Sequence, residues 1–326
     1  MKKDFVTKLF SGKSIKKAIS LVICLALCLM TVPFGAFASS EAENKPIKVL
    51  AIGNSYSNNT TEYVSRIAES MGLDITAASL YFPGCALWRH VQFYENYRDL
   101  GHDGYYESAY DQHYEDLYVN GAVVEGYASI QEAIAYTDWD YITIQQMPDW
   151  CDDIDSYWTE EKPYITKLYG YVLDELEANS NNKCEILIHQ GWSFSHAMSI
   201  DNAYEHYPRD YDNTRDFFAA IESTVNQAAE IVKDKCGLKS APDLVLSGKA
   251  VQLAKDEFGF GDTYGKADSL YADNISHLSS LGKYLAACVW IETFAAKANL
   301  PVTDVRTTDY FPIGQGITAD KAAALR

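Results

Sequence analysis

A serine and a histidine near opposite ends of the chain are the residues best suited to chemistry. Ser55 lies in Gly53-Asn54-Ser55-Tyr56-Ser57, and His277 lies in Ser276-His277-Leu278-Ser279. A serine hydroxyl is a weak nucleophile until a base takes its proton and N–H donors stabilise the oxyanion. His277 can be that base, and Asp273, four residues earlier, could fix its tautomer. The pair therefore predicts nucleophilic catalysis by Ser55.

The residues around Ser55 predict a strand, a tight turn and a helix. The apolar run 49–52 ends at Gly53, and the residues after Ser55 carry apolar side chains at helical spacing. Such a turn places Ser55 at the carboxyl end of a parallel strand, where open α/β sheets bind their ligands. Taken alone, the stretch is equally compatible with Ser55 as a plain turn or capping residue.

Strand-like and helix-like segments alternate along the rest of the chain. We expect further strands at 74–81, 141–144, 184–188 and 242–246, and helices at 88–97, 129–136, 160–178, 214–235, 248–258 and 278–296. This alternation predicts a three-layer α/β sandwich, with a mainly parallel sheet and helices on both faces. Loops that follow parallel strands gather at one edge of the sheet, so Ser55 and His277 can meet there.

Residues 98–127 form an aromatic-rich insertion in this pattern. The segment is dense in tyrosines and acids and has no sustained period. We expect a β-ribbon around 117–124, laid over one face of the domain. Tyrosines offer flat faces and hydroxyl groups that suit sugar rings, but packing of the insertion on its own core explains them equally well.

The first 38 residues have the composition of a secretory signal peptide. Six lysines precede and flank the start of an apolar run, 18–32, and Ala36-Phe37-Ala38 is a small-x-small cleavage signal. The flanks favour export over a retained anchor, and the bulky Leu27 before Cys28 disfavours a lipoprotein. The chain is thus expected to have a leader (1–38), a polar tether (39–46), a domain (47–300) and a tail (301–326), and to be extracellular without a membrane contact.

Charge and cysteine content exclude several classes of protein. Without the leader's six lysines and one aspartate, 21 basic and 44 acidic residues remain, a formal charge of −23. Such a surface repels nucleic-acid backbones and anionic membranes, so no nucleic-acid partner is expected. Five widely spaced cysteines remain, with no Cys-x-x-Cys pair and no zinc-site spacing. We therefore expect free buried thiols and no zinc site. The Ser–His chemistry expected above requires neither a metal nor an organic cofactor.

The first and last of these motifs together resemble the SGNH (GDSL-type) hydrolase superfamily. Gly53-Asn54-Ser55-Tyr56-Ser57 is similar to its first block, which carries the nucleophilic serine. Ser276-His277-Leu278-Ser279, followed by Leu281-Gly282-Lys283-Tyr284, is similar to its last block, which carries the catalytic histidine. The combination resembles a secreted bacterial branch that is classified as a domain of unknown function. The resemblance covers roughly residues 47–300.

The two middle blocks of the superfamily have weaker counterparts. Gly84, in Pro83-Gly84-Cys85-Ala86-Leu87, resembles the glycine whose N–H helps to form the oxyanion hole. Gln145-Gln146 occupies the place of the asparagine-bearing block. The resemblance therefore implies an oxyanion hole made by the N–H groups of Ser55 and Gly84, with help from Gln146.

Three other polar or aromatic residues beside these blocks are expected to contact the substrate. They are Asn54, Gln145 and Trp192. From the residues alone, Gln145 and Gln146 could instead bond to neighbouring loops, since unpaired amides at the end of a buried strand are costly.

The acid of the triad departs from the superfamily's pattern. That acid usually lies three residues before the histidine, where this chain has Asn274, and Asp273 is one residue earlier. The loop could bulge so that Asp273 serves, or a Ser–His pair could work with backbone help alone.

The resemblance implies a secreted esterase that removes short acyl groups, with an ester of a small molecule or polysaccharide as substrate. The alternative is a catalytically weak carbohydrate-binding or surface protein on the same fold. Asn274 and the tyrosine-rich segment favour that alternative, whereas the presence of both Ser55 and His277 favours the enzyme.

Overall fold

The computed structural model describes residues 45–107, 115–126, 128–195, 211, 213–273, 275–300 and 320. The expected leader 1–38, the tether as far as residue 44 and nearly all of the tail 301–326 lie outside the described residues. The boundaries expected for those segments stay predictions.

Seven strands among the described residues form one sheet, in the order β4-β3-β2-β1-β5-β6-β7. They are β1 (Ile47–Gly53), β2 (Ile75–Tyr81), β3 (Asp116–Val119), β4 (Ala122–Glu125), β5 (Tyr141–Ile144), β6 (Glu185–His189) and β7 (Leu244–Val245). β1, β2, β5, β6 and β7 pair in parallel, whereas β3 and β4 pair antiparallel. Because the chain passes from β1 to β2 on one side and later to β5 on the other, β1 ends at the point where the strand order reverses.

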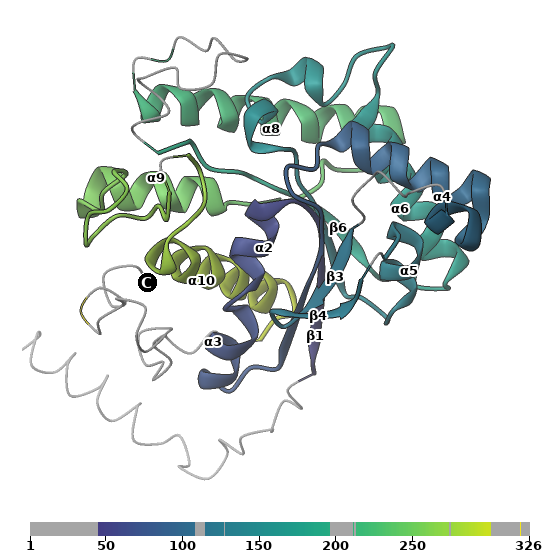
Figure 1. Ribbon diagram of the computed structural model, residues 1–326, viewed down its shortest axis with the longest axis horizontal. Helices are drawn as coiled ribbons and strands as arrows, with labels where there is room; N and C mark the ends of the chain where they lie inside the picture. The colour runs from purple at the N-terminus through teal and green to yellow at the C-terminus, as the bar shows by residue number, and fades with distance from the viewer. Residues whose placement is uncertain are drawn as a thin grey trace, which may run out of the picture. The chain divides into compact units, whose positions relative to one another are not determined.

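Helices cover both faces of this sheet (Figure 1). One face packs against α2 (Ser55–Thr61), α3 (Val64–Ser70), α9 (Ser247–Phe258) and α10 (Ser280–Lys297). The other packs against α4 (Leu87–Glu107), α5 (Ile130–Ala135), α6 (Tyr164–Ala178) and α8 (Thr214–Cys236). The expected three-layer α/β sandwich with a mainly parallel sheet is confirmed.

The central strand shows why its apolar run is continuous. Val49 and Ala51 of β1 belong to the core under α2, α3, α9 and α10, and Leu50 and Ile52 belong to the core on the other side. All four side chains are fully buried. Successive side chains of a strand point to opposite faces, so a strand covered on both faces needs apolar residues at every position.

The aromatic-rich insertion differs from the expectation. Its ribbon does form, as the β3–β4 hairpin, but β3 pairs antiparallel with β2 and extends the sheet at its edge. It is therefore not laid over a face of the domain. The unpaired backbone groups of an edge strand such as β2 favour this pairing.

Several helix boundaries also differ from the expectation, for local reasons. α6 begins at Tyr164 and not at residue 160, because Pro163 occupies its N-cap position. α4 runs on to Glu107 across a kink at Gly101, where φ is 69°. Ser55 itself opens α2, because Asn54 directly before it is the N-cap.

None of the helices in the described part of the chain is long and apolar enough to cross a membrane. Cys85, Cys151, Cys184, Cys236 and Cys288 are free thiols.

The turn after β1 depends on the small size of Gly53. A Cβ atom at this position would lie 2.2 Å from Ser57 Oγ and 3.0 Å from Gln145 Oε1, and these two oxygens share a hydrogen bond. We expect Gly53→Ala to lower the free energy of unfolding by about 1–3 kcal/mol, the usual cost of overpacking. Urea unfolding measures this change.

Gly170, on α6, is the matched control, because a Cβ there would meet no atom within 4 Å. Gly170→Ala should leave stability unchanged or raise it by up to about 1 kcal/mol, since alanine favours helix. Equal stabilities for the two variants would contradict this account of the turn.

Candidate active site

Asn54 holds together the loops that follow three neighbouring strands. It is fully buried and is the N-cap of α2, where its Oδ1 accepts a hydrogen bond from Tyr56 N at 3.1 Å. Its Nδ2 donates to the backbone oxygens of Cys85, at 3.0 Å, and Gln146, at 3.4 Å. One amide therefore fixes the start of α2, where Ser55 lies, against the loops after β2 and β5.

The loop after β2 turns tightly at Gly84. Cys85 N donates to Phe82 O at 3.2 Å, which closes a four-residue turn. Pro83 and then Gly84, with φ at +60°, is the sequence that a type II turn favours. Among the described residues, none accepts a hydrogen bond from the Gly84 N–H, so this donor is available to a substrate oxygen.

His277 is oriented by Asp273. Asp273 Oδ2 accepts from Nδ1 of His277 in a short contact, and Oδ1 accepts from the backbone N–H groups of Ile275, Ser276 and His277 at 2.8–3.2 Å. Partial burial disfavours the carboxylate, but the hydrogen bonds from His277 and the backbone outweigh it and lower the pKa of Asp273. With Nδ1 donating to Asp273, Nε2 is left as the basic nitrogen.

Asp273 thus occupies the place of the orienting acid. Its loop bulges tightly enough for an aspartate four residues before the histidine to reach the ring. Asn274, the alternative considered from the sequence, lies outside the described residues.

Both sides of His277 are tied to the helix that Ser55 opens. Leu278 N, after the histidine, donates to Asn59 Oδ1 at 2.7 Å. Before the histidine, Ser276 O accepts from Trp192 Nε1 at 2.8 Å, and the Trp192 ring stacks on Tyr56 at 3.8 Å. Ser55 and Asn59 lie one turn apart on the same side of α2, so Ser55 faces the histidine loop.

Both candidate catalytic side chains can be reached from solvent. The side chain of His277 is 45% exposed and that of Asp273 34% exposed, and Ser55 is partly buried. No hydrogen bond joins Ser55 to His277 among the described residues. Catalytic hydrogen bonds are often longer without substrate and shorten in the complex.

The side chains of Gln145 and Gln146 form hydrogen bonds with the segments around the site. Gln146 Oε1 accepts from Leu87 N at 3.0 Å and Met147 N at 2.8 Å, and its Nε2 donates to the Ser156 backbone oxygen and hydroxyl. Gln145 Oε1 accepts from Ser57 Oγ at 2.8 Å. Since its amide N–H groups are already used, Gln146 is placed as a support of the Gly84 loop and not as an oxyanion donor.

The three expected substrate contacts are all buried. Asn54 and Trp192 have no exposed surface, and Gln145 is 1% exposed. The structure places them under the site as supports, which corrects the expectation. Residue type and position at a strand end do not distinguish a side chain that lines a site from one that holds it.

Asn59 and Tyr56 are the positioning residues that the sequence argument missed. Asn59 could have been found, because it follows Ser55 by one helical turn and is polar on a helix with buried faces. The role of Tyr56 depends on Trp192, 136 residues later, and no local signal predicts that contact.

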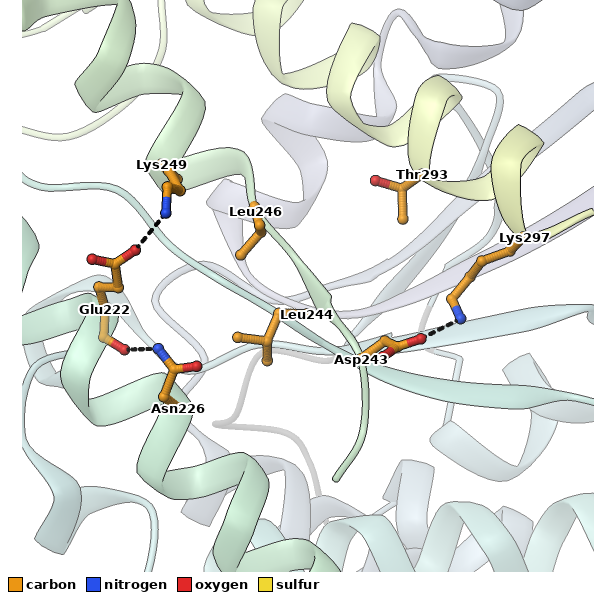
Figure 2. Close-up of a pocket in the computed structure, with 8 residues that line it drawn as sticks. All are labelled: Glu222, Asn226, Asp243, Leu244, Leu246, Lys249, Thr293 and Lys297. Atoms are coloured by element: carbon orange, nitrogen blue, oxygen red, sulfur yellow. Dashed lines mark hydrogen bonds and ion pairs between the residues drawn. The ribbon is translucent and has the colours of Figure 1, made fainter. Parts of the chain in front are cut away.

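A separate pocket lies beside the edge strand β7 (Figure 2). It is lined by Glu222, Asn226, Asp243, Leu244, Leu246, Lys249, Thr293 and Lys297 and has a volume of about 560 Å³. Its lysines are paired, Lys249 with Glu222 at 3.2 Å and Lys297 with Asp243 at 2.6 Å (Figure 2). It contains none of the expected catalytic residues.

Comparison with known proteins gives a family match over most of the chain. The model of the family described as "Domain of unknown function (DUF4886)" matches residues 48–312. The crystal structure of a DUF4886 family protein from Bacteroides uniformis is 28% identical, with a TM-score of 0.63, and the alignment covers 86% of this chain and 92% of that one. No curated protein matches the sequence significantly.

Two more distant solved structures are also similar. One, from Slackia heliotrinireducens, has a name that assigns it provisionally to the SGNH hydrolases. It is 17% identical, with a TM-score of 0.43, and the alignment covers 76% of this chain and 98% of that one. The other is a catalytic mutant of an acetylxylan esterase from Geobacillus stearothermophilus. It is 14% identical, with a TM-score of 0.36, and the alignment covers 78% of this chain and 95% of that one. These likenesses are too weak to assign a function, which must come from the chain's own residues.

The lowered pKa of Asp273 predicts a dependence of stability on pH. Its ordinary value is 3.8, and a lowered folded-state value means that the carboxylate stabilises the fold above that pH. The contribution is lost as the pH falls through the lowered pKa. We expect Asp273→Asn to lower Tm by roughly 1–3 °C at neutral pH, a small effect because the group is partly exposed.

Thermal unfolding from pH 7 to pH 3 measures the difference, which should shrink at the acid end. Asp268→Asn, at an exposed position in the preceding loop, is the control and should behave as the wild type. A Tm difference for Asp273→Asn that is constant over the whole range would contradict the assignment.

Proposed function

Since the chain belongs to the DUF4886 family, whose function its description leaves open, we propose from its own site that it is a serine esterase of the SGNH type. The observation that carries the proposal is the arrangement around His277. Asp273 holds its Nδ1, and the residues on either side of it are tied to the helix that Ser55 opens.

The proposed reaction begins when Ser55 Oγ attacks the carbonyl carbon of an ester. His277 Nε2 takes the hydroxyl proton, and Asp273 stabilises the imidazolium that results. The N–H groups of Ser55 and Gly84 hold the oxyanion. The tetrahedral intermediate then expels the alcohol, to which His277 returns the proton, and leaves an acyl group on Ser55.

Water completes the cycle by the same route. His277 takes a proton from the water that attacks the acyl-enzyme, and it returns that proton to Ser55 Oγ as the acid leaves. The mechanism therefore needs only the chain's own side chains and two backbone donors. Gln146 has a supporting role in it, because its amide is hydrogen-bonded to Ser156.

For the substrate we propose short acyl esters of carbohydrates. The support is the resemblance of the motifs, together with a part-exposed histidine that a bulky alcohol can approach. The alternative, a carbohydrate-binding protein on the same fold, has no need of a buried network that orients both Ser55 and His277. It would be the conclusion if the wild-type protein bound acetylated glycans without hydrolysing them.

Ser55→Ala should lower kcat for an acetylated sugar by about 10³-fold or more, because the hydroxyl forms the covalent intermediate. The substrate for this assay is first identified by testing residues 39–326 on a panel of acetylated glycans. Circular dichroism then shows whether the variant is folded. Ser65→Ala, at a similarly part-buried serine on α3, is the matched control and should retain wild-type kcat.

We also propose that the protein is exported and cleaved after Ala38, since Ala36-Phe37-Ala38 directly follows the apolar run. N-terminal sequencing of secreted material should then begin at Ser39. Cell-bound protein that retains residues 18–32 would show that the run is an anchor.

A further inference from the structure

Three buried side chains converge beneath the Gly84 turn. Cys85 directly follows Gly84, His90 lies in the first turn of α4, and Glu115 directly precedes β3. One possible ligand atom from each lies within 4.8 Å of the other two. All three residues have no exposed surface.

Two polar atoms of this cluster are buried without a hydrogen-bond partner among the described residues. His90 Nδ1 and Glu115 Oε1 form an ion pair at 2.5 Å, whereas His90 Nε2 and Glu115 Oε2 have no hydrogen-bond partner among the described residues. Two such buried atoms are costly, because each has lost water without a replacement. A bound ion is one of the few arrangements that satisfies them together.

The donor set indicates which ion. A thiolate, an imidazole and a carboxylate are the three ligand types of zinc sites, whereas magnesium and calcium prefer oxygen alone. We propose that Cys85, His90 and Glu115 bind a single zinc ion, with water in the fourth position. The site is distinct from Ser55 and His277 and does not depend on the proposed esterase activity.

The distances fit a tetrahedral site after a small movement. Zinc bonds of about 2.0–2.3 Å place neighbouring ligand atoms roughly 3.3–3.7 Å apart. The His90 nitrogen and the Glu115 oxygen must therefore separate by about 1 Å, and the thiol sulfur already lies within 4.8 Å of both residues' ligand atoms. Rotation of the side chains provides such shifts without movement of the backbone.

Binding would deprotonate two of the ligands: a divalent ion takes the thiolate and the carboxylate, and their protons leave to solvent.

The zinc would stabilise the turn that carries Gly84, the proposed oxyanion donor. The backbone oxygen of Cys85 accepts from Asn54, and its backbone N–H closes the Gly84 turn. Zinc bonds to His90 and Glu115 would fix this turn to α4 and to the β3–β4 hairpin. Since the cluster is not exposed, the ion would position the turn and would not contact substrate.

Cobalt(II) provides the direct probe, because a cobalt–thiolate bond gives a charge-transfer band in the near ultraviolet. Titration of the metal-depleted full domain, shown by circular dichroism to be folded, should produce this band at one cobalt per chain, and zinc should abolish it. Zinc should also raise Tm by about 5 °C or more, since it binds the folded state.

Variants test the assignment of the ligands. Cys85→Ser and Glu115→Gln should lose the band and the shift in Tm with zinc, whereas Cys288→Ser, at another buried cysteine, should keep both. A folded wild-type protein that shows no band, and no change in Tm with zinc, would overturn the proposal and leave a metal-free His90–Glu115 pair. A band that persists in Cys85→Ser would overturn it as well.

Discussion

The candidate active site depends first on the buried amide of Asn54. Because that side chain has no contact with water, its hydrogen bonds must be made within the protein. It makes them to the first turn of α2 and to the backbone oxygens of Cys85 and Gln146. The loops after β1, β2 and β5 are therefore fixed relative to one another by one residue, which directly precedes Ser55.

The sheet explains why a single amide can reach three loops. β1 lies between β2 and β5 and pairs with both in parallel, so the carboxyl ends of the three strands are neighbours. β6 is the next strand along, and the loop after it carries Trp192. Through Trp192 the same edge of the sheet holds the histidine loop, which is otherwise more than 200 residues away in the chain from Ser55.

Much of this architecture could be predicted from the sequence. Continuous apolar runs alternate with segments whose apolar residues have helical spacing, and this predicted a parallel sheet with a layer of helices on each face. Strands covered on both faces need apolar residues throughout. The positions of Ser55 after β1 and His277 before α10 followed from the same argument. Family membership agrees with the resemblance that these motifs carried.

The remainder depends on contacts that a linear sequence does not encode locally. Trp192 and Gln145 follow strands and looked suitable for substrate, yet both are buried. Whether such a side chain lines or supports a site is decided by what packs over it. Asp273 reaches His277 only because its other oxygen binds three backbone N–H groups and bends the loop.

The central claim is that His277 and its tethers to α2 make Ser55 nucleophilic, and labelling with a fluorophosphonate tests it most directly. Mass spectrometry of a proteolytic digest should show one adduct on the wild-type protein, on the peptide that contains Ser55. His277→Ala, folded by circular dichroism, should label at least 10²-fold more slowly, since the base is gone. An adduct on another residue, or equal labelling of the wild type and His277→Ala, would contradict the account.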